Sequence, residues 1–72
     1  MSDNPTLAVE VNGEQRQVSG EISIAAMLEQ LGLDPGKVAV ERNREIVPRS
    51  TLGDVRVADG DRFEIVHFVG GG

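Results

Sequence analysis

This chain of 72 residues contains no cysteine, no tryptophan, no tyrosine and only one histidine. A disulfide framework is therefore excluded, and so is a zinc site built from cysteine and histidine. Small domains often depend on such cross-links, so this one has to fold on its apolar core alone. The absence of cysteine also fits a reducing compartment, and we expect a cytoplasmic protein.

Long apolar segments and basic clusters are also missing. No apolar run approaches the roughly 20 residues of a membrane span, and the first residues lack the pattern of a secretory signal. The seven Lys and Arg residues are scattered, and the net charge is −5. Nucleic acids and anionic lipids would be repelled by such a surface. We expect a soluble protein that binds neither nucleic acid nor membranes and whose partners carry basic surfaces.

The first half of the chain has the pattern of a hairpin followed by a helix. Apolar residues alternate over positions 7–11, and the Asn-Gly pair at 12–13 favours a type I′ turn into a second strand. Ser23 is the predicted N-cap of the helix. Its apolar stripe consists of Ile24, Met27, Leu28 and Leu31. Gly32 and the Asp-Pro-Gly that follows end a helix of about ten residues.

The second half of the chain predicts three more strands. Positions 38–41 alternate, and the short strand at 45–47 ends at a proline that suits a sheet edge. Residues 49–58 are irregular, and Asp59-Gly60-Asp61 is a turn. The last strand, at 62–68, is the most apolar.

This order of elements predicts an α+β domain, a mixed sheet of four to five strands packed on one helix. The first and last strands are the most apolar and are expected to be central neighbours. We expect residues 1–72 to form a single domain with a flexible C-terminal Gly-Gly tail at 69–72. The predicted core contains Leu7, Val9, Val11, Ile24, Leu28, Leu31, Val38, Val40, Phe63 and Ile65.

Residues that could carry catalysis within this chain are sparse. His67 is in phase with Phe63 and Ile65 and has no recognisable nucleophile or orienting acid, so a packed or strand-end role is favoured. The acidic residues around Asp59-Gly60-Asp61 lack the spacing of a calcium loop. We therefore expect no enzyme activity, no metal site and no bound cofactor.

The chain ends in three glycines, Gly70, Gly71 and Gly72, directly after its most apolar strand. A frayed terminus is one interpretation. The functional interpretation is that a tail without side chains enters a narrow channel and presents its carboxylate to the active site of a partner. Adenylation by ATP would make this carboxylate an acyl donor for a sulfur or nitrogen nucleophile. The tail thus favours a carrier or tag whose chemistry belongs to its partners.

The element order and the Gly-Gly end resemble the ubiquitin-like β-grasp fold. Within it, residues 38–49 and 57–72 resemble the ThiS family of sulfur carriers in thiamine biosynthesis, and the resemblance covers nearly the whole chain from Leu7. The most specific motifs are Asn43, Ile46-Val47-Pro48-Arg49, Asp59-Gly60-Asp61 and the Val-Gly-Gly-Gly of 69–72.

The resemblance implies a cycle at the C-terminus. A ThiF-type adenylating enzyme uses ATP to activate the carboxylate of Gly72, and Gly70 and Gly71 thread the tail into its channel. Sulfur, derived from cysteine through a cysteine desulfurase in many systems, converts the carboxylate to a thiocarboxylate. A ThiG-type thiazole synthase takes this sulfur into the thiazole ring. The carrier by itself is expected to be a monomer.

Three other functions stay open on the sequence. A sulfur carrier for molybdopterin has the same fold, but those chains tend to approach Gly-Gly through prolines, where this one has Phe68 and Val69. A ubiquitin-like protein tag would end in the same carboxyl-adenylate. A plain interaction domain would carry an idle tail.

A docking face is predicted from strand alternation. Val66 and Phe68 point to the sheet face opposite Phe63, which the single helix leaves uncovered. We expect Phe68 to be the main contact with the partner, and Glu10 and Glu64 to steer a basic surface. The alternative is that the irregular segment or the N-terminal arm covers this face.

Overall fold

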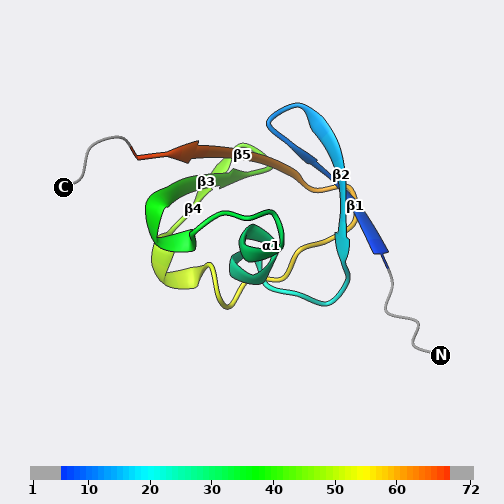
Figure 1. The fold of residues 1–72 in the computed structure, drawn as a ribbon, viewed down its shortest axis with the longest axis horizontal. Coiled ribbons are helices and arrows are strands. Elements are labelled where there is room, and N and C mark those ends of the chain that lie inside the picture. The colour runs from blue at the N-terminus through cyan, green and yellow to red at the C-terminus, as the bar shows by residue number, and fades with distance from the viewer. Residues whose placement is uncertain (1–5, 69–72) are drawn as a thin grey trace.

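A computed structural model describes residues 6–68 of the chain (Figure 1). Its elements follow the predicted order and confirm the α+β architecture. They are β1 (Thr6–Val11), β2 (Glu14–Ser19), α1 (Ile24–Gln30), β3 (Val38–Arg42), β4 (Glu45–Val47) and β5 (Arg62–His67), with two 3-10 helices, η1 (Pro35–Lys37) and η2 (Arg49–Thr51). The predicted tail at 69–72 lies outside the described residues.

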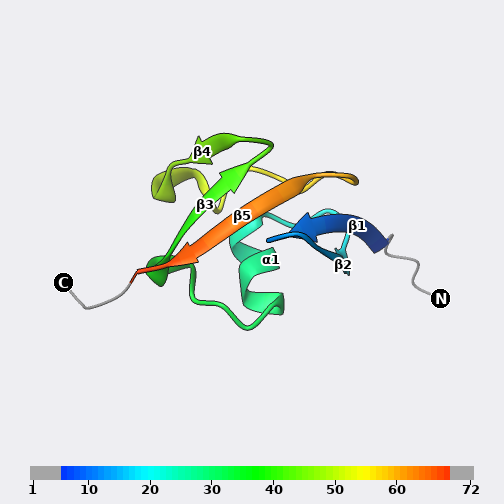
Figure 2. The ribbon, with the colours of Figure 1, turned by 90° about the horizontal axis from the view of Figure 1, so that it is seen from above.

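The strands form one mixed sheet in the order β2-β1-β5-β3-β4. β5 runs parallel to β1 and antiparallel to β3, while both hairpins are antiparallel. Figure 2 looks onto the face of the sheet that is turned away from α1, which we call the outer face. The first and last strands are central neighbours as predicted, and β4, which precedes Pro48, is an edge strand.

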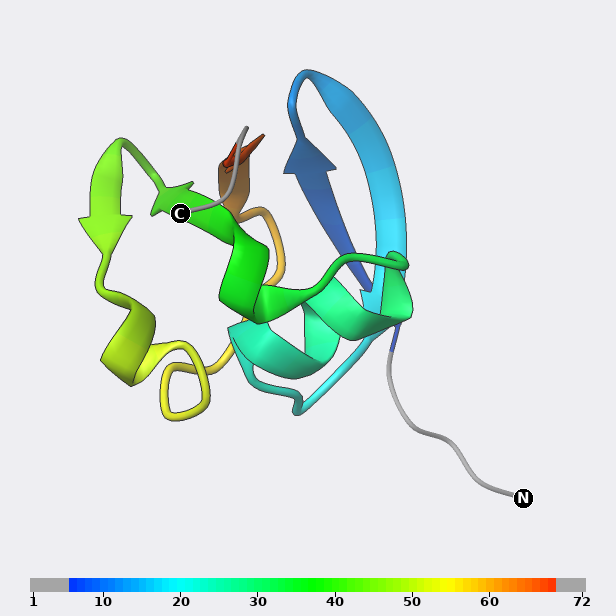
Figure 3. The ribbon, with the colours of Figure 1, turned by 60° about the vertical axis from the view of Figure 1, so that its left-hand side comes forward.

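The helix begins as predicted and ends earlier than predicted. The Ser23 hydroxyl accepts a hydrogen bond from the Ala26 amide at 3.0 Å, which satisfies a free donor of the first turn. α1 has seven residues instead of about ten, since Leu31 is already its C-cap and Gly32 follows with a φ of +82°. Figure 3 shows α1 on one side of the sheet, with the two hairpins flanking β5.

The core lies between α1 and the inner face of the sheet. Eight of the ten predicted core residues are buried, whereas Leu7 and Leu31 are half-buried at the periphery. Leu31 is less buried because the helix stops there, and Leu7 lies near the open end of the first hairpin. The other buried apolar residues are Val18, Met27, Leu52 and Val57.

The Asn12 side chain continues the pairing between β1 and β5. The two strands share only the backbone pairs Glu10 with Arg62 and Val11 with Phe63. Beyond them, Asn12 Oδ1 accepts from the Ile65 amide at 2.8 Å, and Asn12 Nδ2 donates to the Ile65 carbonyl at 3.1 Å. Asn12 is therefore both the predicted turn residue, with a φ of 50°, and a side-chain extension of the sheet.

Asp61 is the only buried charged residue within residues 6–68. Its Oδ2 accepts from the Ala58 amide at 2.8 Å and from Arg42 Nε at 2.9 Å, and its Oδ1 accepts from Asn43 Nδ2 at 3.1 Å. Burial raises the pKa of this carboxyl, but the hydrogen bonds and the Arg42 charge outweigh it, so the pKa of Asp61 is lowered. The carboxylate thus ties the turn between β3 and β4 to the start of β5.

Acid should weaken the fold through Asp61. A lowered folded pKa means that the ionised carboxyl contributes stability above its ordinary pKa of 3.8, and that this contribution is lost as the pH falls from there through the folded pKa. Asp61→Asn should cost about 1–3 kcal/mol at pH 7 and much less at pH 2. Urea unfolding of both proteins across this pH range measures the difference, and a gap independent of pH would contradict the assignment.

Shortening a helix side chain that lies in the core should lower the stability of the domain strongly. Leu28 has an exposed fraction of 0%. Leu28→Ala should lower the free energy of unfolding by about 2–5 kcal/mol, because it removes buried methyl groups and leaves a cavity. The exposed neighbour Glu29 offers a matched control, Glu29→Ala. If both variants unfold at the same urea concentration, the helix has been placed in the wrong phase.

Candidate functional site

The predicted reactive residues Gly70, Gly71 and Gly72 lie beyond Phe68, the last described residue, so the structure places only the strand that leads to them. The Phe68 amide donates to the Lys37 carbonyl at 3.0 Å. This bond extends the pairing of β5 with β3 and fixes the main chain at the point where the glycine tail follows. His67, the last residue of β5, is exposed, which agrees with a strand-end role.

The outer face carries the exposed apolar residues of the described chain. Val66 is 63% exposed and Phe68 is 55% exposed, as the alternation of β5 predicts, and Ile46 is 76% exposed. Ile46 lies directly opposite Glu41, which lies opposite Glu64, so Ile46 belongs to the same face. The sequence did not reveal this, because the face of a three-residue strand depends on its register.

The irregular segment after β4 does not bury this face. It contributes one contact, the guanidinium of Arg49, whose Cζ stands 5.2 Å from the centroid of the Phe68 ring. This distance is typical of a cation–π interaction. A groove of about 210 Å³ lies between Phe68 and β4, and Arg49 is the only charged residue among its otherwise apolar lining. The N-terminal arm before Thr6 lies outside the described residues.

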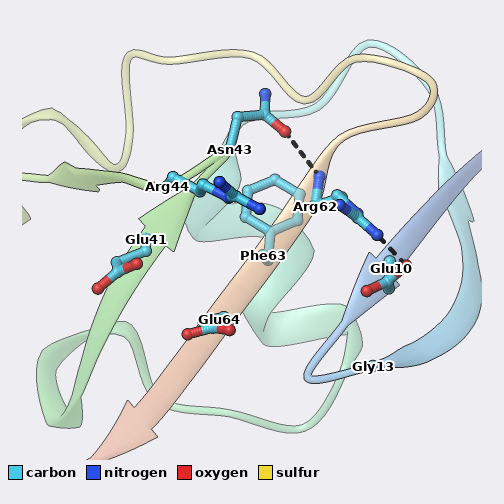
Figure 4. A pocket seen from close by; sticks show the side chains of 8 residues that line it. All are labelled: Glu10, Gly13, Glu41, Asn43, Arg44, Arg62, Phe63 and Glu64. Atoms are coloured by element: carbon cyan, nitrogen blue, oxygen red, sulfur yellow. Dashed lines mark hydrogen bonds and ion pairs between the residues drawn. The ribbon is translucent and has the colours of Figure 1, made fainter.

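A depression of about 230 Å³ lies on the outer face near the start of β5, and its charged lining consists of three glutamates and the two arginines Arg44 and Arg62 (Figure 4). Glu41 on β3 and Glu64 on β5 are direct cross-strand neighbours, an arrangement that is unfavourable for two carboxylates. Neither forms a salt bridge within residues 6–68. A basic group of a partner placed between them would relieve their repulsion.

Glu10 shares the outer face but lies far from Phe68. It pairs with Arg62 at the start of β5, where its Oε1 is 3.5 Å from Arg62 Nε. Phe68 follows six positions later, a separation of roughly 20 Å along an extended strand. The charge of Glu10 is thus partly balanced by Arg62. Glu64 lies between Glu10 and the exposed apolar residues and has no such partner among the described residues. The docking roles of Glu10, Glu64, Val66 and Phe68 stay predictions.

Between Thr6 and Phe68, no group of three His, Asp or Glu side chains gathers in a way that could hold a metal ion. No helix in this range is both long enough and apolar enough to cross a bilayer.

Comparison with known proteins identifies relatives of the whole fold. The profile of the ThiS family matches residues 9–72. A thiazole synthase of Paramagnetospirillum magneticum is 55% identical over 62 residues, which are 86% of this chain and 19% of that protein. A thiazole synthase of Magnetococcus marinus is 41% identical over 66 residues, 92% of this chain and 20% of that one. The chain therefore spans about a fifth of the length of these two relatives.

Relatives of similar length also match. The sulfur carrier protein ThiS of Bacillus subtilis is 44% identical over 50 residues, 69% of this chain and 76% of that one. The crystal structure of a thiamine biosynthesis protein, ThiS, from Geobacter metallireducens superposes with a TM-score of 0.76 at 32% identity, covering 92% of this chain and 100% of that one. A designed protein based on human erythrocytic ubiquitin, at a TM-score of 0.53 and 14% identity over 93% of this chain and 95% of that one, shares the fold.

These matches confirm the predicted ubiquitin-like β-grasp fold, and the family match covers the described domain together with the glycine tail. The chain belongs to the ThiS family, which its sequence resembles.

Proposed function

We propose that this chain carries sulfur as a thiocarboxylate on Gly72 and donates it to the thiazole ring of the thiamine precursor. The observation that carries the proposal is the extent of the ThiS match, which runs from residue 9 through the three glycines to residue 72. The acceptor of the sulfur is a ThiG-type thiazole synthase. The activating partner is a ThiF-type adenylating enzyme that supplies the ATP site, so the carrier needs no bound cofactor.

The chemistry at Gly72 balances with ATP and a sulfur nucleophile. A carboxylate oxygen attacks the α-phosphorus of ATP, which forms an acyl-adenylate and releases pyrophosphate. A hydrosulfide-level nucleophile then attacks the carbonyl carbon, AMP leaves, and the thiocarboxylate remains. A cysteine desulfurase is the proposed origin of this sulfur. It forms a persulfide, which a thiol reductant has to reduce by two electrons, itself becoming a disulfide, before the sulfur reaches the hydrosulfide level. Cysteine is absent from the chain, so the transferred sulfur has no thiol of the carrier to which it could be diverted.

The described domain contributes positioning to this cycle. β5 is paired with β1 at its start and with β3 along its length, and the Phe68 amide is bonded to the Lys37 carbonyl, so the glycine tail follows a hydrogen-bonded strand. Glycine has no Cβ, which lets the main chain pass close to the walls of a channel. Reaction geometry depends on holding the reacting carboxylate in place, and a rigid base with a thin tail is suited to that purpose.

The longer relatives support the thiazole synthase as a partner. Two proteins named thiazole synthase contain a segment similar to this chain within a chain about five times its length. A carrier segment joined to the enzyme that consumes its sulfur would be held near it at a high effective concentration. We therefore propose that this carrier domain docks on a thiazole synthase as well as on the adenylating enzyme.

The tail should carry the chemistry without contributing to the fold. Deleting Gly72, or replacing Gly71 by valine, should abolish ATP–pyrophosphate exchange with the adenylating enzyme, because the carboxylate is displaced or the channel is blocked. The melting temperature should stay nearly unchanged. Gly53→Val is the matched control, since Gly53 has open space around it and an ordinary φ.

Mass spectrometry of the loaded carrier completes this test. With ATP and a sulfur source, the wild type should gain the mass of one oxygen-to-sulfur exchange. Normal pyrophosphate exchange by the Gly72 deletion would refute the carrier function. An isopeptide bond to lysines of other proteins, found in place of the thiocarboxylate, would identify a protein tag instead.

Phe68 should contribute to docking more than to folding. Phe68→Ala should weaken binding to the adenylating enzyme by more than about 1 kcal/mol, because aromatic anchors dominate most interfaces. The unfolding midpoint should change little, since the ring is 55% exposed. Gln17→Ala, on the edge strand β2, is a control at an exposed site remote from β5. If Phe68→Ala unfolds the domain while its folded fraction binds normally, Phe68 is a core residue and docking occurs elsewhere.

A further inference from the structure

The outer face changes in character along β5 in the direction of the tail. It begins with the ion pair of Glu10 and Arg62 and continues with the facing carboxylates of Glu41 and Glu64. An apolar row follows, in which Val66 lies opposite Ala39. Along β5, from its start toward its end, the outer face thus changes from charged to apolar.

The end of this face next to the tail is basic. The carbonyl of Lys37 accepts the hydrogen bond of the Phe68 amide, and Arg49 stands over the Phe68 ring. Lys37 belongs to η1 and Arg49 to η2, and both 3-10 helices lie at the C-terminal end of β5 (Figure 1). We call Lys37 and Arg49 the basic rim.

The charges of the basic rim are available to a partner. Both residues are exposed, and neither forms a salt bridge within residues 6–68, which is also true of Arg44 and Arg56. Lys37 and Arg49 differ from these two in lying beside Phe68, at the end of β5. The Arg49 guanidinium stands over the Phe68 ring and donates no hydrogen bond within residues 6–68. A guanidinium can donate two parallel hydrogen bonds to a carboxylate. The nearby Asp34 carboxylate accepts a hydrogen bond from the Gly36 amide at 2.9 Å and caps η1.

We propose that the basic rim docks on carboxylates at the mouth of the channel through which the adenylating enzyme receives the glycine tail. This inference rests on the proposed function and names a surface chemistry for its partner. The order of charges makes docking directional, because a carrier turned end for end would bring its basic rim against the basic groups that face Glu41 and Glu64. In the matching orientation, the end of β5 points at the channel.

Charge reversal of the basic rim tests the proposal. Lys37→Glu and Arg49→Glu are compared with Arg16→Glu, which makes the same change in net charge on β2, at the far edge of the sheet. We expect each rim variant to bind the cognate adenylating enzyme about five- to tenfold more weakly at low ionic strength, mainly through slower association. Arg16→Glu should stay within about twofold, and physiological salt should reduce the difference.

Further variants separate charge from packing. Arg49→Lys keeps the charge and should bind far better than Arg49→Gln, while the unfolding midpoints of all variants check the fold. Replacing a carboxylate at the channel mouth by lysine should restore binding of Arg49→Glu. The proposal is overturned if the rim variants bind as Arg16→Glu does, or more tightly than the wild type. The proposed function fails by a different result, namely no pyrophosphate exchange with the wild-type carrier.

Discussion

The pairing of β5 on both of its sides determines how the rest of the molecule is arranged. β1 runs parallel to it and β3 antiparallel, so the last strand of the chain lies in the middle of the sheet. One row of its side chains, with Phe63 and Ile65, enters the core, and the other row, with Val66, faces solvent. Because parallel pairing with β1 is short, the Asn12 amide side chain completes it. The first half of β5 is thereby paired on both sides, whereas the residues that lead to the tail are held by β3 and by the Lys37 carbonyl.

A single helix can cover only one face of a five-stranded sheet. The core beneath α1 has to stabilise the domain without disulfides or a zinc site of cysteine and histidine. The exposed side chains of the outer face do not belong to this core. Exposed apolar side chains such as Ile46 and Val66 therefore do little for folding, and their grouping on one face is typical of an interaction surface. Their position beside the end of β5 relates that surface to the tail.

Charge is distributed unevenly in this acidic chain. At the start of β5, ion pairs and the Asp61 carboxylate are used within the domain, where they hold the turn after β3 against the strand. By contrast, Glu41 and Glu64 in the middle of the outer face, Arg44 in the turn before β4, and Lys37 and Arg49 near the end of β5 have no salt-bridge partner between residues 6 and 68. A partner can therefore pair with these charges without breaking an ion pair of the domain.

The sequence by itself determined the elements whose signals are local. The Asn-Gly turn, the Ser23 cap and the alternation of β5 act within a few residues, and so they predicted the hairpin, the helix start and the two faces of β5. Only the tertiary structure decided that Ile46 lies on the outer face and that the Arg49 guanidinium stands over the Phe68 ring. It also decided that Glu10 and Phe68 lie at opposite ends of the outer face. The reason is physical: strand register and contacts between elements depend on segments far apart in the chain, and no local pattern specifies them.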